Sequence, residues 1–405
     1  MRAFTTQLIS DVRGLPAAVH VMIGGQFINR FGAFVMPFLA LYLTGQGIAL
    51  GRVALVLGAV SVGGLFGPIA SGYLADALGR RNTIVIALVT AALTTVALYY
   101  CHTVRQFMAV GFFHGFCSFL YAPAANALLT DLVTAEQRVL TFALMRLAIN
   151  AGFAAGPAMA GLLFSRSPAL IFYGDAFTTL AFAVLAFGWL PHGLRTVTGR
   201  VTSPGVVWQS WREALADMAR NRPFIFLVVC SLLMEIAFVQ TFNVLALTTV
   251  NRGLTPAQYG VVMGMNGALI MLIELPLNQW ARRFDLRWVL VVGYALVGLG
   301  CASFGIMRTQ AGFFAAMGLF TLGEMLSLPI SMSYASHLSP EKFRGRYFGT
   351  RGMVWALAGL AGSLGVWCYG RLGDNWWYVA GGIGLLGALL MLISTLQEDR
   401  RPAGV

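Results

Sequence analysis

Long apolar stretches, each separated from the next by a few polar or charged residues, recur along the whole chain of 405 residues. A helix of about 20 apolar residues spans the hydrocarbon core of a bilayer, and the chain holds about twelve such stretches. They lie near 17–44, 52–76, 82–101, 105–131, 138–165, 168–190, 223–250, 256–281, 287–307, 311–337, 345–370 and 374–396. The pattern predicts an all-α integral membrane protein with twelve transmembrane helices.

One long polar interruption, 191–222, divides these stretches into six and six. We therefore expect an N-terminal six-helix bundle over 1–190, a cytoplasmic linker over 191–222 and a C-terminal six-helix bundle over 223–405. Residues 208–218 also fit an amphipathic helix lying on the membrane surface. The sequence alone leaves that helix and a solvated linker both open.

The two halves repeat each other at a constant offset of 206 residues. The matching pairs are Leu39 with Leu245, Ala40 with Ala246, Leu41 with Leu247, Gly47 with Gly253, Gly58 with Gly264, Pro123 with Pro329, Arg138 with Arg344 and Gly156 with Gly362. The same offset aligns acidic residues of the second half with uncharged residues of the first: Glu235 with Asn29, Glu274 with Pro68 and Glu324 with Ser118. The halves thus share a scaffold and are expected to differ in chemistry.

Charge changes the picture in one respect, which is orientation. The net charge is +12, and only 10% of the residues are charged, against about 25% in soluble proteins. With a cytoplasmic N-terminus, 18 of the 27 basic residues fall on cytoplasmic segments and six on the opposite loops. This asymmetry follows the positive-inside rule, so it predicts both termini in the cytoplasm and argues against a nucleic-acid partner.

The turn between the second and third apolar stretches carries an unusual motif. It reads Gly72-Tyr73-Leu74-Ala75-Asp76-Ala77-Leu78-Gly79-Arg80-Arg81. In residue types, spacing and position, this motif resembles the cytoplasmic loop signature of the major facilitator superfamily (MFS) of secondary transporters. The resemblance implies a fold of two pseudo-symmetric six-helix bundles, and alternating access to a site at the membrane midplane between them.

The same resemblance assigns a gate to the cytoplasmic side. It implies that Arg80 pairs with Asp131 and that Asp76 faces the N-terminal end of the eleventh span, where the helix dipole favours an anion. We expect the gating residues to be Gly72, Asp76, Gly79, Arg80, Arg81, Asp131, Arg146, Glu274 and Arg351. Among these, Arg146 and Glu274 are expected to pair across the halves, although a plain structural ion pair is the alternative.

The fifth stretch holds a second family motif. Residues 152–161 resemble the Gly-x-x-x-Gly-Pro-x-x-Gly-Gly antiporter motif, with Ala160 in place of one glycine. Gly152, Gly156 and Gly161 are small enough for close helix packing, and Pro157 removes a backbone donor. This motif favours export.

Charged side chains near mid-membrane are the candidates for the mechanism, because such positions are costly unless they face a cavity or a partner. Glu235 and Glu324 are the expected sites for a proton, a cationic substrate or both, since burial favours the neutral form of a carboxylate. A static ion pair that stabilises the bundle is the alternative. Arg30, next to Asn29 in the first span, either pairs with one of these glutamates or binds an anionic substrate.

These features predict a proton-coupled exporter of amphipathic, drug-like compounds in a bacterial-type inner membrane. The alternative within transport is a carrier of one defined metabolite, such as an organic anion, sugar, siderophore or lysolipid. An enzyme or receptor is disfavoured because no catalytic constellation, metal cluster or phosphate-binding motif is found. We expect no cofactor and no bound metal, and we expect the proton to be the coupling ion. We also expect a monomer whose partners are the small-molecule substrate and the bilayer.

Overall fold

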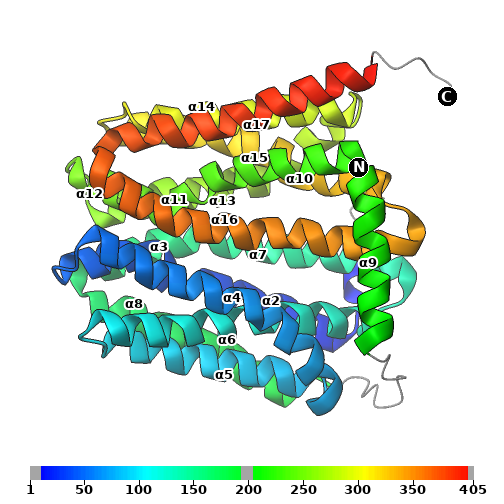
Figure 1. Cartoon of the computed structure of the whole chain (residues 1–405). Coiled ribbons are helices and arrows are strands. Elements are labelled where there is room, and N and C mark those ends of the chain that lie inside the picture. The colour runs from blue at the N-terminus through cyan, green and yellow to red at the C-terminus, as the bar shows by residue number, and fades with distance from the viewer. Residues whose placement is uncertain (1–10, 193–203, 400–405) are drawn as a thin grey trace. The chain divides into compact units, whose positions relative to one another are not determined.

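The computed structural model describes residues 11–192 and 204–399, and within them every regular element is a helix (Figure 1). In the first half these are α2 (Ala17–Phe31), α3 (Val35–Gly45), α4 (Leu50–Leu78), α5 (Arg80–Tyr99), α6 (Val104–Leu132), α7 (Ala135–Arg166) and α8 (Pro168–Trp189). In the second they are α9 (Pro204–Arg220), α10 (Arg222–Phe238), α11 (Gln240–Asn243), α12 (Leu245–Asn251), α13 (Pro256–Ala281), α14 (Leu286–Phe304), α15 (Gln310–Leu338), η1 (Glu341–Phe343), α16 (Arg344–Leu372), η2 (Gly373–Asn375) and α17 (Trp376–Asp399).

Eleven segments of the described residues are long and apolar enough to cross a membrane. The last of them, Arg346–Gln397, has 52 residues and contains two helices, α16 and α17, joined by the short turn η2. The predicted class, a helical multi-pass membrane protein, is confirmed.

The chain forms two compact units. Unit 1 comprises Met1–Leu39 and Ala59–Gly199, and unit 2 comprises Ala40–Gly58 and Arg200–Val405. In unit 1, α5 packs on α6 and α8, and α2 packs on α7 and α8. In unit 2, α14 packs on α15 and α17, and α10 packs on α16 and α17. The segment Ala40–Gly58 lies with unit 2 although it precedes most of unit 1 in the chain.

Glycines let helices within each unit approach to backbone contact. A Cβ added at Gly115 of α6 would lie 2.0 Å from the carbonyl oxygen of Val60 in α4. In unit 2, a Cβ added at Gly298 of α14 would lie 2.9 Å from the carbonyl oxygen of Gly381 in α17. Close backbone approach of this kind provides much of the van der Waals packing that holds membrane helices together.

The sequence repeat has a structural counterpart. Gly47 and Gly253 both have positive φ, at +75° and +86°, where each ends the helix before it. The first apolar stretch is broken between α2 and α3, and the seventh is broken at Val239 and Val244 between α10, α11 and α12. Both halves therefore interrupt the first span of each set of six.

Residues 204–220 form a helix, which is one of the two forms that the sequence leaves open for this stretch. Figure 1 shows α9 running across the ends of α10 and α16, and both helices contact it. The Tyr347 hydroxyl of α16 donates to the carboxylate of Asp217 at 2.5 Å, and Lys342 pairs with Glu213 at 3.1 Å. Ala214 and Met218 are buried. The linker residues 193–203 lie outside the described residues.

Candidate functional site

A buried ion pair lies within unit 2. Glu235, near the end of α10, accepts at Oε1 from Nη2 of Arg351 in α16, with the two atoms 2.5 Å apart. Only 1% of the Glu235 side chain and 5% of the Arg351 side chain are exposed. The same Nη2 also donates to the Ser331 hydroxyl of α15 at 3.1 Å, so three helices meet at this pair.

The pair is only partly satisfied. Oε2 of Glu235 and Nε of Arg351 are buried and have no hydrogen-bond partner among the described residues. Buried polar atoms are usually paired, and exceptions concentrate at strained or functional positions. Arg351, which we expected at the gate, is thus the partner of Glu235 within unit 2. The role of Arg30 stays a prediction.

Polar and aromatic side chains surround Glu235 on its own helix. One turn before it, Ser231 bonds to the Tyr294 hydroxyl of α14 at 2.8 Å, and both residues are fully buried. One turn after it, Phe238 stacks on Phe320 of α15 with ring centroids 5.3 Å apart, and it lies tilted against Trp355 of α16 at 5.6 Å. The carboxylate thus lies next to an aromatic cluster.

The second glutamate, Glu324, lies in α15 one turn after Phe320. Its Oε2 accepts from Nδ2 of Asn266 in α13 at 2.7 Å. The same Nδ2 lies 3.0 Å from Oγ1 of Thr321. Glu324 is partly exposed, whereas Asn266 and Thr321 are buried. Asn266 and Thr321 are functional candidates that sequence reasoning missed, because an Asn or Thr in an apolar helix carries no charge to draw attention.

In unit 1, Asn29 is held by a neighbouring helix. Its amide donates to the Thr179 hydroxyl of α8 at 3.2 Å, and the next residue, Arg30, is exposed. The helix ends one residue later, at Phe31. Asn29 is therefore fixed within unit 1, and Arg30 projects from the last turn of α2.

The break in this span depends on a residue that the sequence reasoning overlooked. Asp175 of α8 is 9% exposed and accepts from the backbone N–H of Val35, the first residue of α3, at 3.1 Å. A carboxylate at a helix N-terminus satisfies a free N–H and complements the dipole. Asp175 lies in an apolar span, so the argument that drew attention to Glu235 also applies to it.

The loop motif contains an ion pair within unit 1. Arg80 pairs with Asp131, as the resemblance implied, and its Nη1 also donates to the carbonyl oxygen of Ala127 at 2.6 Å. Arg81 bonds instead to His192, at 2.7 Å.

The glycines of the loop motif play different parts. Gly79, between α4 and α5, has a φ of +88°, a conformation that other residues rarely adopt. A Cβ added at Gly72 would meet no heavy atom of the described residues within 4 Å. The side chain of Asp76 lies outside the described set, and its contact with the eleventh span stays a prediction.

The motif of the fifth span packs directly on the first. A Cβ added at Gly156 of α7 would lie 2.5 Å from the carbonyl oxygen of Phe31, and one added at Gly152 would lie 2.7 Å from its backbone nitrogen. Pro157 and Gly161 follow, both buried inside α7. The motif therefore supports the end of α2, next to Arg30.

The expected gate pair falls on different units. Arg146 lies exposed on α7 of unit 1, and Glu274 lies buried in α13 of unit 2, at 6% exposure. Their pairing stays a prediction.

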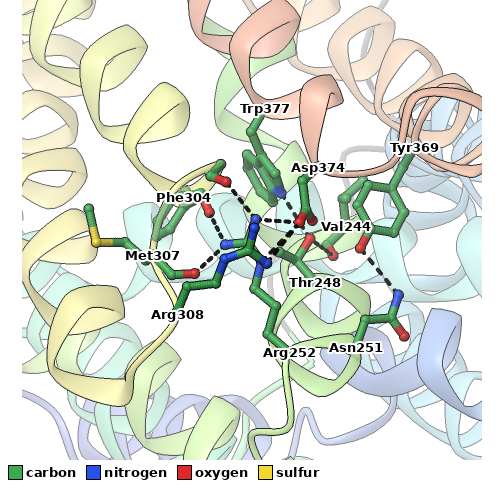
Figure 2. Close-up of polar contacts among 11 residues, drawn as sticks. Val244, Thr248, Asn251, Arg252, Phe304, Met307, Arg308, Tyr369, Asp374 and Trp377 are labelled. Atoms are coloured by element: carbon green, nitrogen blue, oxygen red, sulfur yellow. Dashed lines mark hydrogen bonds and ion pairs between the residues drawn. The ribbon is translucent and has the colours of Figure 1, made fainter.

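A second arginine with a buried side chain, Arg252, links three segments of unit 2 (Figure 2). The Arg252 side chain is 3% exposed; it pairs with Asp374 at 2.8 Å and donates to the backbone carbonyls of Phe304 and Gly305, both at 2.6 Å, and of Met307. These carbonyls lie at the end of α14 and just after it, so Arg252 ties the end of α12 to the α14–α15 turn and to η2. Arg252 is one of the six basic residues that the sequence pattern assigns to the loops opposite the cytoplasm.

A sequence model described as Major Facilitator Superfamily matches residues 22–363 and 236–404. The chain is 25% identical to a Na(+), Li(+), K(+)/H(+) antiporter of Planococcus maritimus, over 94% of this chain and 96% of that protein. It is 24% identical to the multidrug resistance protein MdtH of Yersinia pestis (strain Pestoides F), over 94% of each.

Two solved structures share the fold. A POT family transporter in complex with 5-aminolevulinic acid has a TM-score of 0.77 at 15% identity, covering 94% of this chain and 96% of that one. A point mutant of the nucleoside transporter NupG has a TM-score of 0.80 at 13% identity, covering 92% of this chain and 98% of that one.

Proposed function

The chain belongs to the major facilitator superfamily, and we propose that it is a proton-coupled antiporter that exports amphipathic, drug-like compounds by alternating access. It is a multi-pass membrane transporter and not an enzyme. We further propose that it acts as a monomer in a bacterial plasma membrane with both termini in the cytoplasm, since its relatives are bacterial and its basic residues favour that side.

The observation that carries this proposal is the buried pair of Glu235 and Arg351. In a dry interior each charge is held by the other, because an isolated ion there costs several kcal/mol. A proton that binds Glu235 removes the negative charge and leaves the guanidinium of Arg351 unpaired. Arg351 cannot lose its own proton. The protonated protein must therefore rearrange or move Arg351 toward water, which links proton binding to a change of conformation.

The surroundings of this pair suit an amphipathic substrate. Phe238, Phe320 and Trp355 form an aromatic cluster one turn from Glu235 on α10 and one turn from Glu324 on α15. Aromatic side chains pack against apolar groups, and the face of an aromatic ring also attracts a cation. The partly exposed carboxylate of Glu324 beside this cluster would bind a cationic amphipathic compound, while Glu235 carries the coupled proton.

The fifth span supports the direction of transport. Gly152, Gly156 and Pro157 resemble the antiporter motif, and the two glycines pack on the end of α2, beside Arg30. The similarity to the multidrug resistance protein MdtH points the same way.

A second candidate is antiport of monovalent cations for protons. The carboxylate of Glu324, the amide of Asn266 and the hydroxyl of Thr321 cluster within hydrogen-bond distance, and oxygen atoms are the ligands that hard cations prefer. One relative is named as a Na(+), Li(+), K(+)/H(+) antiporter. If the protein exchanges monovalent cations for protons, Glu324 binds the cation and the aromatic cluster serves only in packing between helices.

One reconstitution separates the two candidates. The purified full chain is placed in liposomes with an acidic interior and a trapped pH-sensitive dye, and drug-like cations, Na⁺, Li⁺ and K⁺ are added singly outside. Alkalinisation by organic compounds supports drug export, whereas alkalinisation by the inorganic ions alone supports the second candidate. If no addition changes the interior pH relative to empty liposomes, the antiport proposal fails.

Two variants then locate the coupled proton. The Glu235→Gln protein should still bind substrate but lose gradient-driven transport, because Gln accepts no proton. Glu324→Gln is the matched variant, an isosteric change of the other glutamate, and should weaken substrate binding first. Full coupling in Glu235→Gln would refute the role given to the buried pair.

A further inference from the structure

A pocket of about 680 Å³ lies at the end of unit 2 where α13 ends and α14 begins. The charge distribution predicts that this end is cytoplasmic. Arg282, Phe284 and Leu286 line the pocket from the α13–α14 turn, and Ser333 and His337 line it from the last turns of α15. None of these residues takes part in the proposed transport site.

The repeat shows why a pocket exists here. Subtracting 206 from Leu286, Ser333 and His337 leads to Arg80, Ala127 and Asp131 of unit 1. Those three residues form the unit 1 contact in which Arg80 pairs with Asp131 and donates to the carbonyl of Ala127. In unit 2 a leucine replaces the arginine and a histidine replaces the aspartate, so the ion pair that occupies this place in unit 1 cannot form.

The charges at these positions also differ. The cation Arg282 stands where unit 1 has the anion Asp76, and the imidazole of His337 stands where it has the carboxylate of Asp131. Both residues are exposed, and neither side chain forms a hydrogen bond or ion pair within the described part of the chain. Ser333 adds a hydroxyl. The donors facing this pocket suit an oxyanion.

The one acidic residue of the lining is neutralised by its own neighbour. Asp285 accepts from the Arg287 guanidinium at 2.5 and 3.0 Å and from the Arg287 backbone N–H at 2.9 Å. These bonds hold the pKa of Asp285 below its ordinary value. Its charge therefore does not cancel that of Arg282.

The apolar surroundings indicate what carries the anion. Phe284 is 50% exposed and packs edge-on against Trp280, which is 53% exposed, with ring centroids 4.8 Å apart. Exposed aromatic side chains next to basic ones are typical of the depth at which lipid headgroups lie. Leu272 and Leu275, further along α13, are also exposed, as side chains that face lipid are. A soluble anion would gain nothing from these apolar neighbours.

We propose that this pocket binds the phosphate headgroup of an anionic phospholipid, held by Arg282, His337 and Ser333. Basic pockets between transmembrane helices at a cytoplasmic surface are suited to such headgroups. The lipid takes, in unit 2, the place that the Arg80–Asp131 pair takes in unit 1, and it joins α13, α14 and α15 at their ends.

The test measures the thermal stability of the purified full chain in a neutral detergent as phosphatidylglycerol, phosphatidylcholine or inorganic phosphate is added. We expect phosphatidylglycerol to raise the melting temperature and phosphatidylcholine to leave it unchanged. Equal stabilisation by inorganic phosphate would overturn the lipid assignment in favour of a soluble anion.

Variants decide whether the pocket itself is responsible. Loss of a charge-assisted hydrogen bond in Arg282→Ala should raise the phosphatidylglycerol needed for half the effect by about tenfold or more. Arg283→Ala is the matched control, because Arg283 has the same charge in the same turn but does not line the pocket. Loss of one basic residue near an anionic surface should raise the phosphatidylglycerol needed for half the effect by only about fivefold or less. His337→Ala tests the pocket from α15 and should also weaken the effect. Equal losses in Arg282→Ala and Arg283→Ala would reduce the observation to surface charge and refute the site.

Discussion

The buried pair of Glu235 and Arg351 predicts an unequal response to the removal of either partner. In Glu235→Leu the guanidinium of Arg351 remains in a dry interior and cannot shed its proton, so the charge has no means of neutralisation. In Arg351→Met the carboxylate of Glu235 remains, but it can take up a proton and become neutral. We therefore expect Glu235→Leu to be the more destabilising change.

The burial of the pair sets the magnitude. With side-chain exposures of 1% and 5%, both groups are inaccessible to water, and the loss of one partner of such a pair costs about 3–5 kcal/mol. At roughly 2–4 °C for each kcal/mol in a domain of this size, Glu235→Leu should lower the melting temperature by about 10 °C. Arg351→Met should cost less, and its deficit should shrink as pH falls.

The double variant tests the same reasoning from the other side. Glu235→Leu/Arg351→Met removes both charges together with the two polar atoms that have no partner, Oε2 and Nε. Replacing a buried ion pair by apolar side chains of similar size is neutral or stabilising by about 1–4 kcal/mol. The double variant should thus melt at or above the wild-type temperature and show no gradient-driven transport.

The assay is thermal unfolding of the four proteins in one detergent, followed by intrinsic tryptophan fluorescence and read as a double-mutant cycle. Proton-coupled flux in liposomes is measured on the same preparations. A double variant less stable than Glu235→Leu would contradict the electrostatic argument. One that still couples transport to the gradient would contradict the functional role.

Three further predictions concern stability. Arg252→Ala should cost about 3 kcal/mol, because it leaves the carbonyls of Phe304, Gly305 and Met307 without their donor and removes the partner of Asp374. Arg252→Lys should recover only part of this, since one ammonium cannot reach all the acceptors. Melting temperatures of both variants check it, and equal stability of the alanine and wild-type proteins would contradict it. Gly156→Ala should destabilise the protein by about 1–3 kcal/mol through overpacking. Gly24→Ala should be neutral or stabilising, because an added Cβ meets nothing within 4 Å there and alanine has the higher helix propensity. Yields of folded protein distinguish the two variants. Asp175→Ala should cost about 1–3 kcal/mol by leaving the Val35 N–H unsatisfied, and Asp175→Asn should cost less because its side-chain oxygen can still accept, so the order of the two melting temperatures is the test.

Much of the architecture could be predicted because it depends on properties that single residues carry. Apolar runs of sufficient length must be membrane helices, since backbone groups in a bilayer have no water to bond. The Arg80–Asp131 pair was implied by the family resemblance of the loop motif, and it is present. Gly152 and Gly156 were expected to allow close packing, and the backbone of Phe31 lies against both.

The partner of Glu235 could not be predicted in this way. Arg351 is far along the chain from Glu235, and nothing in the spacing of either residue marks the other. The direction in which a helical side chain points turns by about 100° with each residue, so pairing depends on how α10 and α16 are rotated and how deep each lies. Packing of all the neighbouring helices sets these two quantities together.

The sequence by itself thus determined which segments enter the membrane, that the two halves share a scaffold, and that the embedded glutamates of the second half have no acidic counterparts in the first. Only the tertiary structure decided which groups meet: Arg351 with Glu235, Asn266 with Glu324, and Asp175 with the start of α3. The physical reason is that transfer from water to lipid is a property of each residue, whereas a hydrogen bond or ion pair requires two atoms at one distance, and that distance is fixed by the packing of whole helices.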